Sequence, residues 1–277
     1  MITKASGEIE PFSVEKLRRS LGRVNAPSSV IDQVVEHIQN ELKPGMPTYK
    51  IYRHAFSLLR KGERPTAARY SLKQAIRELG PSGHPFEKLV AELLLAQGFS
   101  VEVGKIMQGA CISHEVDVIA QKDNRYVMVE CKFHNQPSIK SDVKVALYVW
   151  ARFLDLEKVW KRLPEHAGKS HEAWLVTNTK LTHDAVKYAK CIGMKAIGWK
   201  YPRGEGLEFL IERSGLHPVT SLTTLSRSQK NQLVARGIIM CKELFENKKA
   251  FDMVGVRPEK VPEVLREIET LCKDCHV

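Results

Sequence analysis

The spacing of apolar residues predicts that the first eighty residues are mostly helical. Two short extended pieces, at residues 2–4 and 8–10, come first. Apolar positions then recur every three or four residues, which is the period of a helix with one buried face. The predicted helices begin after Ser13 and continue at 28–42, 48–60 and 65–79. The glycine- and proline-rich stretch 80–83 interrupts this pattern, so we expect a linker there.

Residues 84–215 show a different pattern, in which strands alternate with helices. Residues 85–97 have helical spacing, and Gly98 ends them. Short apolar runs typical of strands follow. The predicted strands are 99–103, 116–120, 126–131, 173–177 and 195–199, and the predicted helices between them are 141–156 and 182–191. Strands and helices in this order imply an α/β layer with a mixed sheet.

Residues 216–277 show helical patterns only. Turns that contain Gly237 and Gly255 separate the helices. These pieces resemble a degenerate helix–hairpin–helix array that would bind DNA, and a dimerisation or lid module is the alternative. The three patterns together predict a multidomain α/β chain, with domains at 1–80, 84–215 and 216–277.

The charge balance favours a polyanionic partner. The chain has 43 Lys and Arg residues against 32 Asp and Glu residues, which gives a formal net charge of +11. An excess of this size favours nucleic acid as the partner over a charge that serves solubility alone. The hydrophobic fraction of 43% is sufficient for a packed core.

Two sequence signals bear on location. The first ten residues contain no apolar signal core, and no apolar run reaches the roughly 18 residues of a membrane span, so we expect a cytoplasmic protein. The six cysteines are scattered and are expected to be reduced. Cys272, Cys275 and His276 match the spacing of a haem attachment motif. Because no secretion signal and no second ligand pair accompany them, we interpret the match as a coincidence.

Residues 115–132, EVDVIAQKDNRYVMVECK, carry the strongest chemical signal. Side chains alternate along a strand, so Glu130 and Lys132 lie on the same face. Asp117 belongs to the preceding strand, which is the expected hairpin partner. Two neighbouring carboxylates repel each other, and a divalent cation removes that cost. Oxygen ligands favour Mg²⁺ or Mn²⁺, which can polarise a phosphoryl oxygen and activate a bound water that Lys132 orients or deprotonates.

A solvated hairpin with a Glu–Lys pair on its polar face is the alternative, because an acidic residue two positions before a lysine is common. Three features favour the metal site. The run before Glu130 is apolar, Asp117 has hairpin spacing, and Glu87 on the preceding helix could complete the metal shell. The residues therefore favour a site for phosphodiester hydrolysis.

Four segments of the central block match one known pattern. FEKLVAELLLAQGF at 86–99 is an opening helix, HEVDVIA contains Asp117, and VECK contains Glu130 and Lys132. Residues 174–199 supply a later strand, helix and strand. Together these segments resemble the PD-(D/E)xK nucleases, and in particular the Mrr-type restriction endonucleases.

The resemblance covers about 84–200. It implies a restriction-endonuclease-like α/β/α core and a Mg²⁺- or Mn²⁺-dependent endonuclease acting on DNA. Asp117, Glu130, Lys132 and Glu87 are its implied catalytic residues, and the three acids are its implied metal ligands. Many Mrr-type sequences have glutamine where this chain has Glu130.

Other polar residues near this motif each allow two interpretations. Glu115 shares the strand face of Asp117 and could join the metal site, but a solvated strand entry, with His114 beside it, is the stronger interpretation. His134 could contact a phosphate, and a surface histidine is the simpler interpretation. A basic face beside the site, or a solvated helix face, accounts for Lys140, Lys144 and Arg152 on the long helix.

The first block contains a second pattern, ITKASGEIEPFSVEKLRRSL, which by itself indicates a basic hairpin followed by a helix. Its lysines after the first strand and at the start of the helix, its glycine turn and a later Ala67-Ala68-Arg69-Tyr70 resemble the ATP cone. That domain is a nucleotide-binding regulatory module of ribonucleotide reductases and of their repressor. A small basic domain that touches nucleic acid is the alternative.

The ATP-cone resemblance covers about 1–80 and implies binding of ATP or dATP. The implied contacts are Lys4, Glu10, Phe12, Lys16 and Thr48, with Lys4 and Lys16 near the phosphates. ATP cones bind nucleotide without hydrolysis and change oligomeric state, so a homo-oligomer, either a dimer or a tetramer, is expected. No Gly-x-x-x-x-Gly-Lys phosphate loop is present, which argues against ATPase activity.

The sequence thus predicts a metal-dependent endodeoxyribonuclease, in restriction or defence, that an adenine nucleotide regulates. One alternative is a structure-selective nuclease of DNA repair or recombination. Another is a non-catalytic regulator that binds DNA in response to nucleotide.

Overall fold

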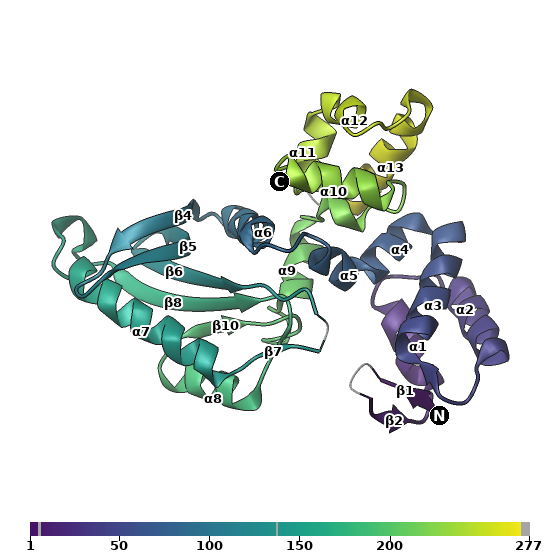
Figure 1. The fold of residues 1–277 in the computed structure, drawn as a ribbon, viewed down its shortest axis with the longest axis horizontal. Coiled ribbons are helices and arrows are strands. Elements are labelled where there is room, and N and C mark those ends of the chain that lie inside the picture. Colours follow the sequence, from purple (N-terminus) through teal and green to yellow (C-terminus); the bar gives the residue numbers. More distant parts are fainter. Residues whose placement is uncertain (5–6, 137, 273–277) are drawn as a thin grey trace.

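The computed structural model describes residues 1–4, 7–136 and 138–272. Three blocks meet at a central junction, with the N-terminal helices on one side, a sheet with flanking helices on the other and the C-terminal helices against the junction (Figure 1). We call them the N-terminal, central and C-terminal blocks. The mixed α/β class predicted from the sequence is confirmed. Among the described residues, no helix is both long and apolar enough to cross a membrane.

The N-terminal block pairs a small sheet with a group of helices. Its strands are β1 (Ile2–Thr3), β2 (Ile9–Glu10) and β3 (Met46–Pro47), in the order β2-β1-β3, with β2 antiparallel and β3 parallel to β1. Its helices are α1 (Val14–Gly22), α2 (Ser28–Glu41), α3 (Thr48–Gly62), α4 (Arg64–Tyr70) and α5 (Leu72–Arg77).

The predicted start of α1 is confirmed, because the Ser13 hydroxyl caps it by accepting a hydrogen bond from the backbone N–H of Lys16 at 3.1 Å. The single helix predicted at 65–79 divides at Ser71 into α4 and α5.

The central block is a five-stranded sheet between helices. The strand order is β10-β8-β6-β5-β4, in which β10, β8 and β6 are parallel and β6, β5 and β4 are antiparallel. The strands are β4 (Ser100–Gln108), β5 (Ser113–Lys122), β6 (Arg125–Lys132), β8 (Ser170–Thr177) and β10 (Lys195–Ile197), with a separate pair β7 (Lys140–Ser141) and β9 (Lys180–Leu181).

Helices cover both faces of this sheet. Two of them, α6 (His84–Leu95) and α9 (Leu207–Ser214), pack on one face with Val118, Val129 and Trp174. The other two, α7 (Val143–Trp160) and α8 (His183–Cys191), pack on the opposite face (Figure 1). The predicted α/β core with a mixed sheet is therefore present, with helices in both outer layers.

The C-terminal block is helical, as predicted. Its helices are α10 (Arg227–Ala235), α11 (Cys241–Glu246), α12 (Lys249–Met253) and α13 (Val261–Leu271). The buried carboxylate of Glu267 in α13 holds the preceding segment, because it accepts hydrogen bonds from the backbone N–H and hydroxyl groups of both Thr223 and Thr224. Cys275 and His276 of the haem-like motif lie outside the described residues.

The junction joins all three blocks through packed side chains. Leu72 and Ile76 of α5 are buried in the core of the central block, although the linker predicted at 80–83 follows them. Ala68 of α4 is buried in the core of the C-terminal block. Arg69, also of α4, donates a hydrogen bond to the Thr270 carbonyl at 3.3 Å. The last two helices of the N-terminal block are thus part of the other two cores.

Candidate active site and nucleotide site

The β5–β6 hairpin brings Asp117 and Glu130 together, as the sequence predicted. Val118 and Val129 are paired across the hairpin, and the two acids are the next residues along their strands. The Asp117 carboxylate accepts the backbone N–H of Cys131 at 2.6 Å. The ladder of paired residues therefore ends where the first acid lies, and its side chain takes up one N–H of the neighbouring strand.

The regular alternation of β5 breaks at Asp117. In an unbroken strand, residues two apart share a face. Val116 instead packs with the α7 side of the sheet, whereas Val118 packs with the α6 side. On the neighbouring strand β4, Gly104 has a φ of +64°. Gly104 is not among the residues that pair between β4 and β5. The pairing of β4 with β5 is therefore interrupted at Gly104 and Asp117, and the side chains of β5 change faces there.

Glu130 is buried, with 8% of its surface exposed, and α7 supplies both of its partners. The hydroxyl of Tyr148 donates to one carboxylate oxygen and Arg152 donates to the other, each at 2.5 Å. Arg152 also donates to the Glu115 carbonyl at 3.1 Å, and its guanidinium lies over the Tyr148 ring at 5.5 Å. One positive charge thus already balances the charge of Glu130.

Burial raises the pKa of Asp117 to about 7, and the negative charges of Glu130 and then Glu87 contribute to the rise. The N–H of Cys131 and the charge of Arg152 act in the opposite direction. A partly buried carboxylate with two acidic neighbours favours binding of a proton or a cation, because its charge is costly without one. The Asp117 site is therefore suited to a divalent cation with oxygen ligands.

Glu87 and Lys132 are the other two residues of the predicted catalytic set, and they belong to different elements, α6 and β6. Glu87 lies in the first turn of α6, where its carboxylate pairs with His84 Nδ1 at 3.0 Å. Lys132 ends β6 opposite Thr177, and its ammonium has no ion-pair partner among the described residues. The oxygens of Glu87, Asp117 and Glu130 do not all lie within 4.8 Å of one another. Glu130 faces α7, whereas Glu87 comes from the helix on the other face of the sheet.

Several neighbouring polar residues have structural partners. His114 Nε2 lies 2.9 Å from the Asp155 carboxylate on α7, and Glu115 has an exposed side chain. His134 Nε2 lies 3.2 Å from the Ser141 hydroxyl, and burial lowers the pKa of this histidine. Of the residues predicted for a basic helix face beside the site, Lys140 is misplaced, whereas Arg152 lies on α7 and contacts the site. Lys140 lies in β7 before the helix begins, and the guanidinium of Arg152 binds Glu130.

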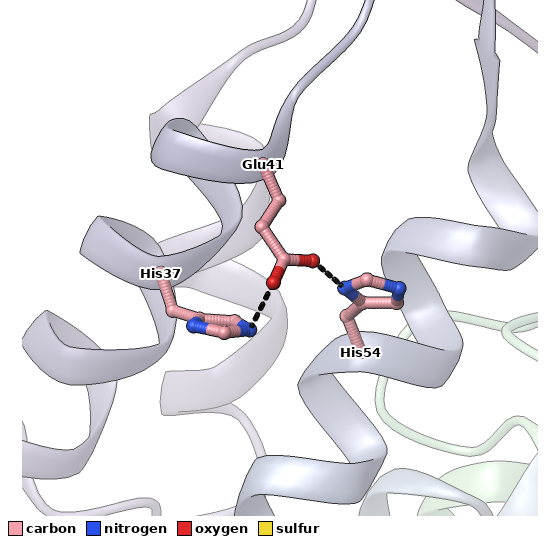
Figure 2. A group of neighbouring side chains, drawn as sticks. All are labelled: His37, Glu41 and His54. Carbon is pink, nitrogen blue, oxygen red and sulfur yellow. Dashed lines mark ion pairs between the residues drawn. The ribbon is translucent and has the colours of Figure 1, made fainter.

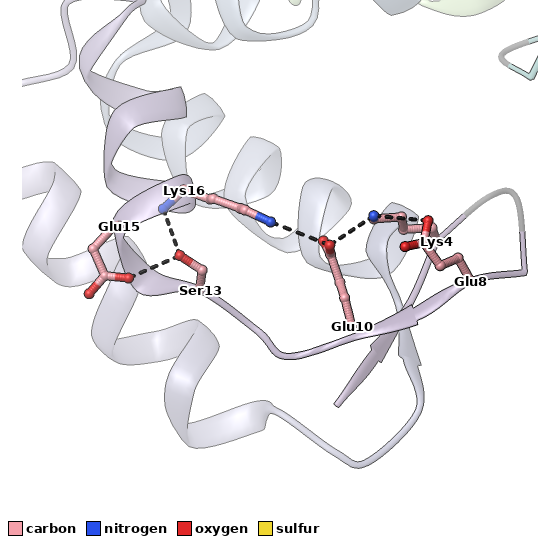
Figure 3. Close-up of polar contacts among 6 residues, drawn as sticks. All are labelled: Lys4, Glu8, Glu10, Ser13, Glu15 and Lys16. Carbon is pink, nitrogen blue, oxygen red and sulfur yellow. Dashed lines mark hydrogen bonds and ion pairs between the residues drawn. The ribbon is translucent and has the colours of Figure 1, made fainter.

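Three of the polar residues predicted for nucleotide binding, Lys4, Glu10 and Lys16, meet at one end of the N-terminal block (Figure 3). The carboxylate of Glu10 pairs with the ammonium of Lys4 at 2.8 Å and with that of Lys16 at 3.3 Å. Lys4 also pairs with Glu8 at 3.1 Å. The hydrogen bond from Lys4 lowers the pKa of Glu10, and the same bond raises the pKa of Lys4. The two lysines predicted to bind phosphate are thus already gathered by a carboxylate.

Thr48 and Phe12 have different surroundings. Thr3 is opposite Pro47 in the parallel pair of β1 and β3, so Lys4 and Thr48 follow at the same end of the sheet. Thr48 is the first residue of α3. Phe12 is half-buried and packs against the apolar core of the N-terminal block. Its predicted contact with nucleotide stays a prediction.

Comparison with known families and structures identifies all three blocks. Residues 1–79 match the ATP cone domain, residues 79–197 match the restriction endonuclease domain of the Mrr type, and residues 217–272 match the C-terminal domain of AF1548-like proteins. An uncharacterized protein of Archaeoglobus fulgidus is 38% identical over 179 residues, which are 64% of this chain and 97% of that protein. The chain belongs to the same family as this Archaeoglobus fulgidus protein, and it combines an ATP cone with an Mrr-type restriction endonuclease domain.

One solved structure resembles much of this chain. The crystal structure of AF1548, a protein of unknown function, matches with a TM-score of 0.55 and 36% sequence identity. The match covers 69% of this chain and 99% of AF1548. The MspJI restriction endonuclease in complex with a 27-mer oligonucleotide has a TM-score of 0.30 at 14% identity, covering 48% of this chain and 29% of that one. The second likeness is too slight to bear on this chain.

Asp117 makes the stability of the metal-free protein depend on pH. The unfolded chain releases this proton near the ordinary pKa of 3.8, whereas the folded protein keeps it up to about 7, so unfolding releases a proton in this window. Stability is therefore lost as the pH rises from about 4 to about 7. Asp117→Asn removes this loss. Its unfolding free energy, measured with urea in EDTA, should gain on that of the wild type between these pH values and level off above them. A constant difference in unfolding free energy between the variant and the wild type across this pH range would contradict the raised pKa of Asp117.

Proposed function

We propose that the protein is a metal-dependent endodeoxyribonuclease that ATP or dATP, bound to the ATP cone, regulates. The observation that carries this proposal is that a partly buried Asp117 and a buried Glu130 meet across the β5–β6 hairpin, and that Lys132 at the end of β6 has no ion-pair partner among the described residues. A restriction endonuclease domain with two such carboxylates and a free ammonium has the groups that phosphodiester hydrolysis needs.

Each residue would have its own part in hydrolysis. Asp117 and Glu130, with Glu87 on the side of α6, would hold Mg²⁺ or Mn²⁺, which supplies charge stabilisation and a more acidic water. Lys132, at the end of the same strand as Glu130, would orient the attacking water and balance negative charge at the phosphate. Arg152 and Tyr148 would position Glu130 until the cation binds, because they occupy both of its oxygens.

DNA is the proposed substrate, and the charge and shape of the molecule support it. The net charge of +11 favours a polyanion. A cleft of about 1180 Å³ lies between the three blocks, and its lining includes Arg77, Lys88 and Arg227. Asn135 and Gln136, shortly after Lys132 along the chain, also line it. A nucleic acid strand in this cleft would contact residues of all three blocks.

The direct test is cleavage of supercoiled plasmid DNA with Mg²⁺ or Mn²⁺, in the presence and absence of ATP and dATP. We expect nicked or linear product with metal and none in EDTA, and a rate that either nucleotide changes. Comparison of methylated duplex, plain duplex and branched DNA separates restriction from repair or recombination. No cleavage of any substrate under all conditions would contradict the nuclease assignment.

One observation favours a second candidate, a non-catalytic regulator that binds DNA in response to nucleotide. Glu130 already has a charge partner in Arg152, so the domain does not need a cation to balance this acid. DNA binding in EDTA that nucleotide alters, without cleavage in Mg²⁺ or Mn²⁺, would select this candidate over the enzyme.

Lys4→Ala is expected to weaken ATP binding by at least about tenfold, because it removes a charge-assisted contact to phosphate. Isothermal titration calorimetry of the full chain with ATP and dATP measures the change. Arg18→Ala is the matched control, because Arg18 lies on the neighbouring helix α1 and its guanidinium pairs with Asp32 at 2.6 Å. Equal loss of affinity in both variants would mean that Lys4 acts only through the overall charge of the ATP cone.

A further inference from the structure

Three side chains from two helices of the ATP cone converge on one point, away from the residues assigned to either site above. His37 and Glu41 lie one turn apart on α2, and His54 lies on α3 (Figure 2). Glu41 Oε1 is 3.2 Å from His37 Nε2, and Glu41 Oε2 is 2.7 Å from His54 Nδ1. Each carboxylate oxygen therefore faces a separate imidazole nitrogen, and one donor atom from each of the three residues lies within 4.8 Å of the others.

Ordinary surface ion pairing explains this arrangement poorly. The three side chains are 43%, 45% and 39% exposed, in the order His37, Glu41 and His54. Exposed ion pairs contribute little to stability, and a pair of this kind needs only one histidine. Here the second histidine comes from a different helix, and the two rings are 6.1 Å apart at a tilt of 37°. Two imidazoles from different helices that converge on one carboxylate form a set of three donors that could hold one ion.

The donor set selects the kind of ion. Two imidazole nitrogens and one carboxylate oxygen are the ligands of zinc sites that keep an open position. Nitrogen donors disfavour Mg²⁺ and Ca²⁺, which take oxygen ligands. Ligands of a tetrahedral Zn²⁺ lie about 3.4 Å from one another at the usual bond lengths. The nitrogen-to-oxygen distances of 3.2 and 2.7 Å are close to this value, so small side-chain rotations would admit the ion.

We propose that His37, Glu41 and His54 form a binding site for a transition-metal dication, Zn²⁺ by its donor set, that fastens α2 to α3. The connection between these helices contains β3 and leads to Thr48 at the start of α3. An ion at this point would join the end of α2 to the middle of α3 and would hold both sides of that connection. The proposal is independent of nuclease activity and of nucleotide binding.

The test is Zn²⁺ binding by the full, metal-stripped chain in competition with a chromogenic chelator. The wild type is compared with His37→Ala, His54→Ala and Glu41→Gln. Each variant should lose one equivalent of bound Zn²⁺ or bind it at least about tenfold more weakly, because loss of even an outer-shell partner has effects of that order. His183→Ala is the matched control, since His183 is an 88% exposed histidine beside an acidic residue and lies outside the cluster. It should bind as the wild type does.

Co²⁺ in place of Zn²⁺ distinguishes this site from cysteine ligands near the end of the chain. A site of two imidazoles and a carboxylate gives ligand-field bands without a sulfur-to-cobalt charge-transfer band. These bands should persist in Cys272→Ser and vanish in His54→Ala. Circular dichroism shows whether the exposed substitutions leave the fold intact. Wild-type stoichiometry and affinity in the three cluster variants, or sulfur-to-cobalt bands as the sole signal, would overturn the proposal.

Discussion

Lys132→Ala is expected to lower Mg²⁺-dependent DNA cleavage by about 10²–10⁴-fold while DNA binding changes little. Lys132 lies at the end of β6, two residues after Glu130, and its ammonium has no ion-pair partner among the described residues, so it is free to act on water or phosphate. Asp117→Asn should have an effect of the same order, because it removes the charge that would hold the cation. The measurement is the single-turnover cleavage rate with saturating enzyme.

Lys187→Ala is the matched control for the loss of a lysine. Lys187 is exposed on α8, away from the hairpin, so its loss changes the net charge by the same amount without touching the site. If Lys187→Ala and Lys132→Ala lower the rate equally, electrostatic attraction of DNA accounts for both and the site assignment is wrong. Cleavage at the wild-type rate by both Lys132→Ala and Asp117→Asn would have the same meaning.

Ile76→Ala is expected to destabilise the nuclease domain by about 2–5 kcal/mol, although Ile76 lies within the sequence range of the ATP cone. The side chain is fully buried with strand residues of the central sheet, so its truncation leaves a cavity in that core. Hydrogen exchange of the β6 and β8 amides, followed by mass spectrometry, should show lost protection in this variant.

Leu59→Ala is the control for a cavity of similar size elsewhere. Leu59 is equally buried but packs in the core of the ATP cone itself. Its truncation should raise exchange in α1 to α3 and leave β6 protected. If Ile76→Ala instead raises exchange only in residues 14–62, α5 stabilises the ATP cone and not the core of the central block.

Local sequence signals were sufficient for the acids and the lysine of the candidate site. Glu130 and Lys132 share a strand face by simple alternation, and the short turn between β5 and β6 places Asp117 across from Glu130. Tyr148 and Arg152 could not be assigned in this way, because their contact with Glu130 depends on how α7 crosses the sheet. Their spacing of four residues on one helix was the available signal, and it suits a pair that reaches one target.

Contacts between segments that are distant in the sequence were the other features that sequence patterns could not predict. The strand β3 is two residues long, contains Pro47 and pairs with β1 about forty residues earlier, so no local pattern predicts it. A helix was predicted over 65–79, but periodicity alone does not say which core buries the apolar face of α5. The arrangement of His37, Glu41 and His54 depends on the packing of α2 against α3, and sequence spacing reveals only its first two members.

The position of α5 limits how such a fusion can exchange its regulatory domain. Removal of the ATP cone by a cut at Gly80 would take Leu72, Ile76 and Leu79 out of the core of the central block and expose apolar surface there. A cut at Ser71, where α4 ends and α5 begins, would leave those side chains with the nuclease. Recombination between proteins that share this restriction endonuclease domain should therefore keep α5 with that domain and vary the sequence before it.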